Sequence, residues 1–188
     1  VSGDVLYVGT VEGPIQAIST TSWAAGRTFE GHDSAVQKML MDGDSLITGS
    51  DDATIRVWNT TTGACERIVE TGHEAVYALA KCGDNKVVSG HGDNTIVVWN
   101  TTSWTNERTL EGHTGYINCL ATTSDGRKML SGSHDGSVKV WDTASWECER
   151  TMAIGRQDVN FLLVSGSTVF SGHRGDIAVT NWETGKGE

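Results

Sequence analysis

The sequence predicts an all-β protein assembled from four-stranded antiparallel sheets. Among 188 residues glycine occurs 23 times and proline once, and short runs of β-branched residues alternate with turn residues. This composition is typical of short strands joined by tight turns. The same four-strand pattern then recurs at a spacing of about 40 residues, which indicates a repeat architecture.

Four strands are expected in the unit around Trp99, each a short run with alternating apolar residues. Hairpin turns that contain Gly, Asp and Asn separate the first three strands, and Gly and Asn tolerate the positive φ that such turns require. The expected strands are 75–82, 86–90, 95–99 and 106–111.

Three segments of the chain align with one another without a gap. Each runs from a glycine through a turn to a tryptophan, and Trp58, Trp99 and Trp141 are 41 and 42 residues apart. A Gly-His pair precedes each tryptophan by 26, 26 and 28 residues. The aligned segments are 49–63, 90–104 and 132–146, and the histidines are His32, His73 and His113.

Two weaker copies flank these three. The first, at 9–23, has Ile18 in the tryptophan position, and the last, at 171–185, has Thr180 there. Arg156 stands in the last copy where the others have histidine. We interpret these changes as repeat degeneracy; the alternative is that the divergent residues serve a partner surface.

Four strands per unit with Gly-His and Trp-Asp/Asn markers resemble the WD-repeat β-propeller family. The resemblance covers essentially the whole chain, although the Trp-Asp dipeptide itself occurs only at 141–142. It implies a single propeller region, 1–188, of four-stranded antiparallel blades. The implied units are roughly 1–30 (partial), 31–71, 72–111, 112–153 and 154–188 (partial).

We expect the ring of blades to be incomplete in this chain. The first unit begins in what should be a second strand, at 4–9, and the last ends just beyond a third strand, at 176–181. Propellers close with about 4–8 blades, often by pairing strands from both termini. These two end units do not merge into one blade, so either other blades of a larger chain or a second copy would complete the ring.

The resemblance also implies a hydrogen-bonded tetrad in each complete unit. It consists of a histidine, a Ser or Thr on the second strand, an Asp in the next turn and the tryptophan. Such a tetrad supplies partners for polar groups that tight turns would otherwise bury unpaired. The three sets are His32–Thr48–Asp52–Trp58, His73–Ser89–Asp93–Trp99 and His113–Ser131–Asp135–Trp141.

A serine, a histidine and a carboxylate are also the parts of a hydrolase. A catalytic site is needed once, however, whereas this set appears three times, always with tryptophan. Nothing in the sequence marks an oxyanion hole or a cleft. We therefore predict no catalytic residues and no enzyme activity; the alternative is a propeller hydrolase or a lectin-like ligand-binding module.

The predicted function is a protein–protein interaction scaffold that docks peptides or protein surfaces on the end faces of the propeller. In the family, the residue before the tetrad Asp and the residues flanking the first-strand apolar position form the usual docking surface. The alternative is that they merely cover the edge of the core. The candidates are Gln37, Asp51, Tyr77, Tyr116, Asn118 and His134.

A second set of tryptophans, Trp23, Trp104 and Trp146, falls in the turn between third and fourth strands. Glycine occupies the same position at Gly63 and Gly185. We expect these indoles to fold over the edge of the blade; the alternative is an exposed contact belt.

The formal net charge is −10 and no run of Lys or Arg occurs. This balance argues against nucleic-acid and anionic-membrane partners. The four cysteines show no metal-ligand spacing and are interpreted as free thiols of an intracellular protein, cytoplasmic or nuclear. We expect no cofactor and no metal. The cysteines are Cys65, Cys82, Cys119 and Cys148.

Overall fold

A computed structural model describes residues 4–154, 158–173 and 176–187. The described residues form strands and turns without a helix, which confirms the all-β prediction. The chain divides into two compact units, residues 1–76 and 77–188. Arg156, the substitute for the expected histidine, lies outside the described residues.

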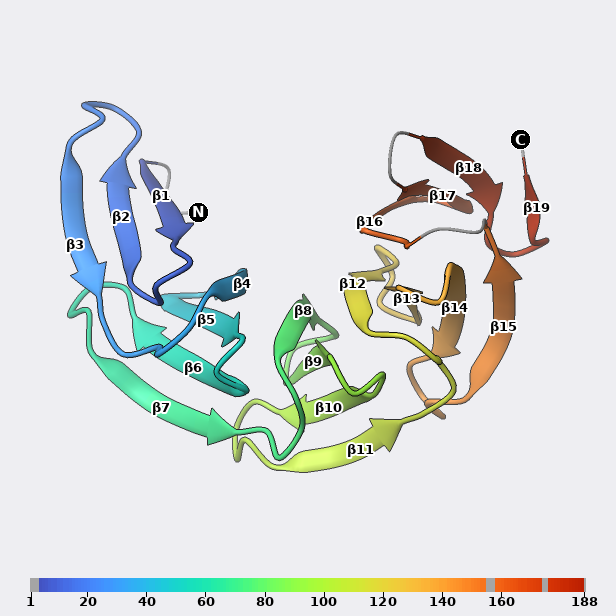
Figure 1. The fold of residues 1–188 in the computed structure, drawn as a ribbon, viewed down its shortest axis with the longest axis horizontal. Coiled ribbons are helices and arrows are strands. Elements are labelled where there is room, and N and C mark those ends of the chain that lie inside the picture. The colour runs from blue at the N-terminus through green and yellow to red at the C-terminus, as the bar shows by residue number, and fades with distance from the viewer. Residues whose placement is uncertain (1–3, 155–157, 174–175, 188) are drawn as a thin grey trace. The chain divides into compact units, whose positions relative to one another are not determined.

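The first unit contains a three-stranded and a four-stranded antiparallel sheet, each with its strands side by side in chain order (Figure 1). The three-stranded sheet consists of β1 (Val5–Gly9), β2 (Ile15–Ser19) and β3 (Ala25–Phe29). The four-stranded sheet consists of β4 (Val36–Asp42), β5 (Ser45–Ser50), β6 (Thr54–Asn59) and β7 (Cys65–Glu70).

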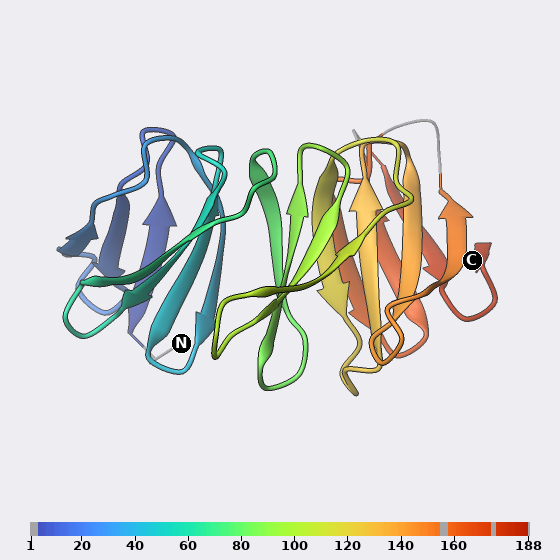
Figure 2. The same cartoon turned by 90° about the horizontal axis from the view of Figure 1, so that it is seen from below.

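The second unit contains three four-stranded sheets, whose strands run antiparallel with turns at both ends (Figure 2). The first consists of β8 (Val76–Lys81), which starts at the unit boundary, β9 (Lys86–His91), β10 (Ile96–Asn100) and β11 (Asn106–Leu110). The second consists of β12 (Ile117–Thr122), β13 (Lys128–Ser133), β14 (Ser137–Asp142) and β15 (Cys148–Ala153). The third consists of β16 (Phe161–Ser165), β17 (Thr168–Gly172), β18 (Ile177–Asn181) and β19 (Lys186–Gly187).

One expectation for the last unit was wrong. We expected it to stop after three strands, but β19 adds a two-residue fourth strand that pairs with Thr180 and Asn181. The turn at Gly185, which has a φ of 73°, reverses the chain here as the turn at Gly63 does before β7. A left-handed glycine at this point brings the chain back beside the third strand.

Each unit buries its core between the faces of neighbouring sheets. In the first unit the rings of Phe29 and Trp58 lie 5.9 Å apart, edge to face, between the two sheets. In the second unit Val98 and Leu110 pack with Trp141 of the next sheet, in one of two such cores. Burying a side chain of this size stabilises the fold by about 1.5–3 kcal/mol.

Glycines on the second strands let neighbouring sheets approach closely. In the second unit, a Cβ atom on Gly90 or Gly132 would lie closer than 3.0 Å to Ile117 or Val159, respectively. Both β-branched residues are fully buried. Each glycine therefore forms a notch that receives a side chain of the following sheet.

Candidate functional site

Four polar side chains are joined by hydrogen bonds in the sheet β12–β15. His113 Nδ1 lies 2.8 Å from Asp135 Oδ2, and His113 Nε2 lies 2.7 Å from Ser131 Oγ. The indole N–H of Trp141 donates to the same Oγ at 2.8 Å. An ionised carboxylate can only accept, so the ring carries its proton on Nδ1 and accepts the Ser131 hydroxyl proton at Nε2.

The first unit repeats this arrangement in the sheet β4–β7. His32 lies 2.7 Å from both Asp52 Oδ2 and Thr48 Oγ1, and Trp58 donates to Thr48 Oγ1 at 2.9 Å. Thr54 bonds the second oxygen of Asp52. These hydrogen bonds thus join the loop before β4 to β5, to the turn after β5 and to β6.

Burial controls the charge of these groups. It lowers the pKa of His113 and of His32 below the ordinary value, which favours the neutral imidazole. Burial alone would raise the pKa of Asp135, but hydrogen bonds from Ser137, the Thr114 N–H and His113 outweigh it. The pKa of Asp135 therefore lies far below its usual range, and the carboxylate stays ionised.

The third predicted set is divided by the unit boundary, with His73 in the first unit and its other members in the second. Within the second unit, Trp99 donates to Ser89 Oγ at 2.7 Å, and Asp93 accepts hydrogen bonds from Thr95. His91 Nε2 also lies 2.7 Å from Ser89 Oγ, a contact that the sequence did not predict. The second unit thus places His91 on this hydroxyl.

The His91 contact has a recognisable signal in the sequence. His91 aligns with Ser50 and Ser133 in the sister units, but the tripeptide Ser-Gly-His recurs at 171–173. There His173 Nε2 lies 3.3 Å from Ser171 Oγ. A histidine two residues after the strand hydroxyl can reach back to it, because side chains two apart share one face of a strand.

The Ser131–His113–Asp135 chain has the connectivity of a hydrolytic triad but not its accessibility. Ser131 is 0% exposed, and its oxygen already accepts the N–H of Trp141. Thr48 in the first unit is equally buried and accepts from Trp58. A nucleophile must reach its substrate, so this geometry braces the sheet and offers no attacking group.

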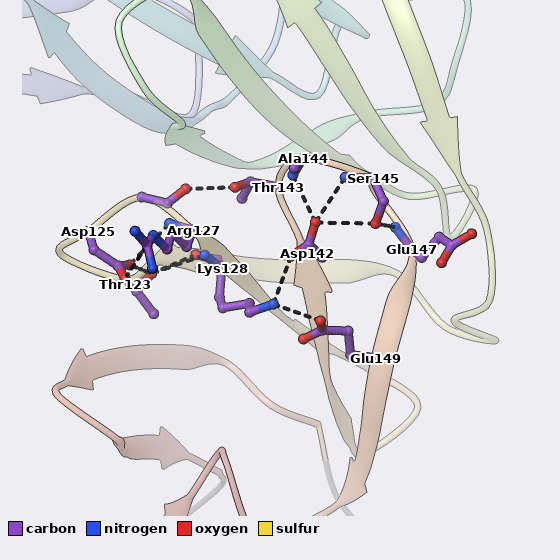
Figure 3. A network of polar contacts seen from close by, with 11 residues as sticks. Thr123, Asp125, Arg127, Lys128, Asp142, Thr143, Ala144, Ser145, Glu147 and Glu149 are labelled. Carbon is purple, nitrogen blue, oxygen red and sulfur yellow. Dashed lines mark hydrogen bonds and ion pairs between the residues drawn. The ribbon is translucent and has the colours of Figure 1, made fainter.

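A second polar network lies at the opposite end of the sheet β12–β15, where β13 begins and β14 ends (Figure 3). Asp142 Oδ1 accepts the backbone N–H groups of Ala144 and Ser145, which forms the following turn. Lys128 Nζ donates to Asp142 Oδ2 at 2.8 Å and to Glu149 Oε1 at 2.7 Å. The lysine therefore lies between two carboxylates.

In the sister sheets an asparagine takes the place of Asp142 and donates to the same glutamate position, and in the sheet β8–β11 Lys86 also donates to Glu107. Asn100 Nδ2 donates to Glu107 and Asn59 Nδ2 to Glu66, both at 2.9 Å. An amide can donate to a carboxylate, whereas Asp142 cannot, so Asp142 needs the cation. The Lys128 hydrogen bond holds the pKa of Asp142 far below its usual range. The Asp of the Trp-Asp dipeptide thus shapes a turn.

Three of the predicted docking residues gather in the second unit, at the end of the sheets away from Lys128. The rings of Tyr116 and His134 stack with centroids 4.9 Å apart and planes 16° apart. The ring of Tyr77 lies beside that of Tyr116, with the two ring centroids 6.0 Å apart. His134 Nδ1 lies 2.9 Å from Asp158 Oδ1. We call Tyr77, Tyr116, His134 and Asp158 the His134 cluster.

Asp158 was missed by the sequence analysis although the pattern contains it. Asp158 precedes Val159 as Tyr116 precedes Ile117, so both flank a first-strand apolar position. The candidates stopped at the three complete units. The same rule applied to the last unit selects Asp158.

The other predicted docking residues are Gln37, Asp51 and Asn118. In the first unit, Gln37 Nε2 donates to Asp51 Oδ2 at 2.9 Å. Asn118 is half-buried on β12. Exposed Gln37 and half-buried Asp51 thus form a pair on the four-stranded sheet of that unit.

Other features bear on the remaining expectations. All four cysteines are described and none forms a disulfide. Within the described ranges, no three potential ligands gather at a metal-sized site, and no helix is long and apolar enough to cross a membrane.

Repeated antiparallel sheets, three of which have a buried hydroxyl that accepts a hydrogen bond from a tryptophan, define a propeller-type repeat protein. The family model described as WD domain, G-beta repeat, matches residues 23–59, 63–100 and 104–142, which is more than half of the chain. The chain belongs to the WD40 repeat family.

Curated relatives share only part of this chain. It is 33% identical over 61 residues to the ribosome biogenesis protein BOP1 homolog of Aedes aegypti, a match to 31% of this chain and 7% of the relative. It is 35% identical over 65 residues to the WD repeat-containing protein pop1 of Schizosaccharomyces pombe, covering 35% of this chain and 8% of pop1. The chain thus spans less than a tenth of the length of these relatives.

Proposed function

We propose that this chain is a non-catalytic docking scaffold that binds peptides or protein surfaces through the His134 cluster. The observation that carries the proposal is the exposed stack of Tyr116 on His134. Tyr116 is 46% exposed, and the side chain of His134 is 49% exposed. WD40 repeats generally mediate protein–protein contacts, which supports a docking function for this chain.

The cluster has the physical properties of a recognition surface. Tyrosine offers a large rigid ring with a polar tip, and such residues dominate binding energy at protein interfaces. The contact with Asp158 and the stack on Tyr116 hold His134 in one orientation. A partner therefore meets a surface whose side chains are already positioned, which lowers the entropy cost of binding.

The remaining parts of the proposal concern what the chain does not bind and where it acts. The net charge of −10 supports a partner other than nucleic acid or an anionic membrane. Four cysteines outside disulfides support an intracellular location. Gln37, Asp51 and Asn118 belong to the proposed docking residues as secondary contacts.

A selection of displayed peptides against the immobilised chain tests the docking function. Selected peptides are expected to lose at least about tenfold in affinity for Tyr116→Ala and His134→Ala, the scale of a moderate interface contact. Ile68→Ala, an exposed change on β7, is the matched control and should bind as the parent does. Peptides that bind Tyr116→Ala undiminished would refute the proposed surface.

The non-catalytic part has a separate test. A fluorophosphonate probe, which labels activated serines, should leave Ser131 unmodified in the folded chain because its hydroxyl is buried. Labelling of Ser131 that vanishes in His113→Ala would establish the hydrolase alternative.

A further inference from the structure

A cavity lies between the two sheets of the first unit. Its volume is about 310 Å³, which is within the range of pockets that hold small ligands. One wall is formed by apolar side chains from a single side of the sheet β1–β3, where Tyr7 pairs directly with Ala17. Thr60, in the turn after β6, lines the cavity from the other sheet. The apolar wall consists of Val5, Tyr7, Ala17 and Phe29.

An indole covers the corresponding wall in the second unit. Three residues of the sheet β8–β11, which align with three of the wall residues, pack in one core with Trp146 of the following sheet. Trp146 lies in the turn after β14 and is only 8% exposed. The aligned pairs are Tyr7 and Val88, Ala17 and Val98, and Phe29 and Leu110.

Glycine takes the place of this tryptophan in the first unit. The Gly63 N–H donates to the Asn59 carbonyl at 2.8 Å, and the Trp146 N–H donates to the Asp142 carbonyl at 2.7 Å, so the two turns are built alike. Both residues have a left-handed backbone, with φ of 78° and 61°. Gly63 contributes no side chain, so the cavity lies where an indole packs in the sister pair of sheets.

Arg27 lies at the mouth of the cavity. It is the one charged side chain among the described residues that line it, and its guanidinium donates to the carbonyl oxygens of Thr61 and Thr62. Residues 25–27 of β3 are exposed, and β3 is the edge strand opposite β1. The mouth therefore opens to solvent at the edge far from the first strand. A guanidinium group attracts the face of an aromatic ring, and that of an indole most strongly.

We propose that this cavity receives the tryptophan side chain of a partner protein. The partner's indole takes the place that Trp146 fills in the second unit, beside the Arg27 guanidinium. It contacts Tyr7 and Phe29, whose rings already lie edge to face with centroids 5.8 Å apart. The cavity belongs to the first unit and the His134 cluster to the second, so this inference is independent of the docking function proposed above.

A titration with N-acetyl-tryptophanamide tests the proposal. In a chain labelled at its alanine methyl groups, the NMR signals of Ala17 and Ala25 should shift saturably, because both residues line the cavity. A dissociation constant of about 1 mM or below is expected for a ligand of this size. N-acetyl-leucinamide should bind at least about tenfold more weakly, since it lacks the aromatic and cation–π contacts.

Gly63→Trp supplies the chain's own indole and should weaken binding of the amide at least about tenfold. The turn accepts this residue, since three tryptophans occupy the same position elsewhere in the chain with φ of 56°, 58° and 61°. Circular dichroism like that of the parent checks the fold. Gly185→Trp makes the same change in the glycine turn of the second unit, so this matched control should bind as the parent does.

Two further variants separate the wall from the mouth. Ala17→Val introduces the residue of the sister sheet and narrows the cavity, so binding followed at Ala25 should weaken. Arg27→Met keeps an apolar stem without the cation and should weaken binding about two- to fivefold. Tyr116→Ala should leave binding unchanged, which separates this site from the His134 cluster.

Three results would overturn the proposal. They are a parent without saturable shifts at Ala17 and Ala25, full binding by both Gly63→Trp and Ala17→Val, and equal affinities for the tryptophan and leucine amides. Each is distinct from a failure of peptide docking at the His134 cluster, which is read from Tyr116→Ala in the peptide selection.

Discussion

Trp141 and Ser131 are joined by a buried hydrogen bond of 2.8 Å, and the serine oxygen is shared with His113. One hydroxyl thus satisfies two ring nitrogens, from β14 and from the loop before β12. Ser131 is fully buried, so removing its hydroxyl leaves Trp141 Nε1 and His113 Nε2 without this partner and without water in its place.

Ser131→Ala is therefore expected to destabilise the fold by about 1–3 kcal/mol, the cost of leaving buried polar groups unpaired. Urea denaturation followed by tryptophan fluorescence measures the change. Ser103→Ala removes an exposed turn hydroxyl and should alter the free energy of unfolding by less than about 0.5 kcal/mol. Equal effects of the two changes would contradict the bracing role.

The stability of the protein should fall on mild acidification. The pKa values of His32 and His113 are lowered in the folded state, so the unfolded chain binds more protons below the ordinary histidine pKa of 6.5. The free energy of unfolding therefore decreases as the pH drops through that value. Asp52 and Asp135 have lowered pKa values too, so further stability is lost as the pH falls below 3.8.

Chemical denaturation across this pH range measures the effect. His113→Gln is expected to be less stable than the parent at neutral pH and to show a shallower loss between neutral pH and pH 5, since one of the two shifted groups is gone. A protein that becomes more stable on mild acidification would contradict the predicted direction of the change.

Lys128→Met should lower the melting temperature by leaving Asp142 and Glu149 face to face without their shared cation. Asp142→Asn in the same chain should restore most of the loss, because Asn100 makes the corresponding contact to Glu107 in the neighbouring sheet. Lys86→Met is the matched control, with a smaller expected effect, since the Asn100 amide still donates to Glu107. Differential scanning calorimetry of the three variants and the parent measures this coupling; a double variant no more stable than Lys128→Met would disprove it.

Replacing two equivalent tryptophans by glycine should have opposite effects. Trp146 and Trp23 both adopt a left-handed backbone, with φ of 61° and 56°. Trp146→Gly relieves a strain of roughly 1 kcal/mol but removes a buried indole, so a net loss of about 2 kcal/mol is expected. Trp23→Gly relieves the same strain at an exposed site and should stabilise the folded chain by about 1 kcal/mol or less.

Urea denaturation of the two variants and the parent tests this pair. A loss of similar size in both variants would show that the change in the free energy of unfolding comes from the turn itself and not from the sheet that covers Trp146.

The strands of the complete units could be predicted from the sequence because their period is local. The four strands expected around Trp99 correspond to β8–β11, with ends displaced by at most one residue. The two-residue strand β19 could not be predicted, because Lys186 and Gly187 carry no alternating pattern. Its pairing is dictated by the left-handed turn at Gly185.

Parts of the candidate site depend on neighbours that a single repeat does not contain. The approach of His113 to Ser131 follows from constant spacing within one unit, whereas Asp158 reaches His134 from the next unit. Trp23 and Trp146 have the same local sequence position, yet one is exposed and the other buried. Their difference lies in the adjoining sheet, which no window of the sequence around either tryptophan describes.

The notches at Gly90 and Gly132 also bear on how this architecture can change. Each glycine belongs to one repeat, but the side chain that fills it, Ile117 or Val159, belongs to the next. A recombination event that exchanges whole repeats at their sequence boundaries therefore separates a glycine from its β-branched counterpart. An exchange whose ends lie in the middle of a repeat keeps the glycine and its β-branched partner together. The unit that can be exchanged without loss of packing is therefore the contact between two neighbouring sheets, not the single repeat.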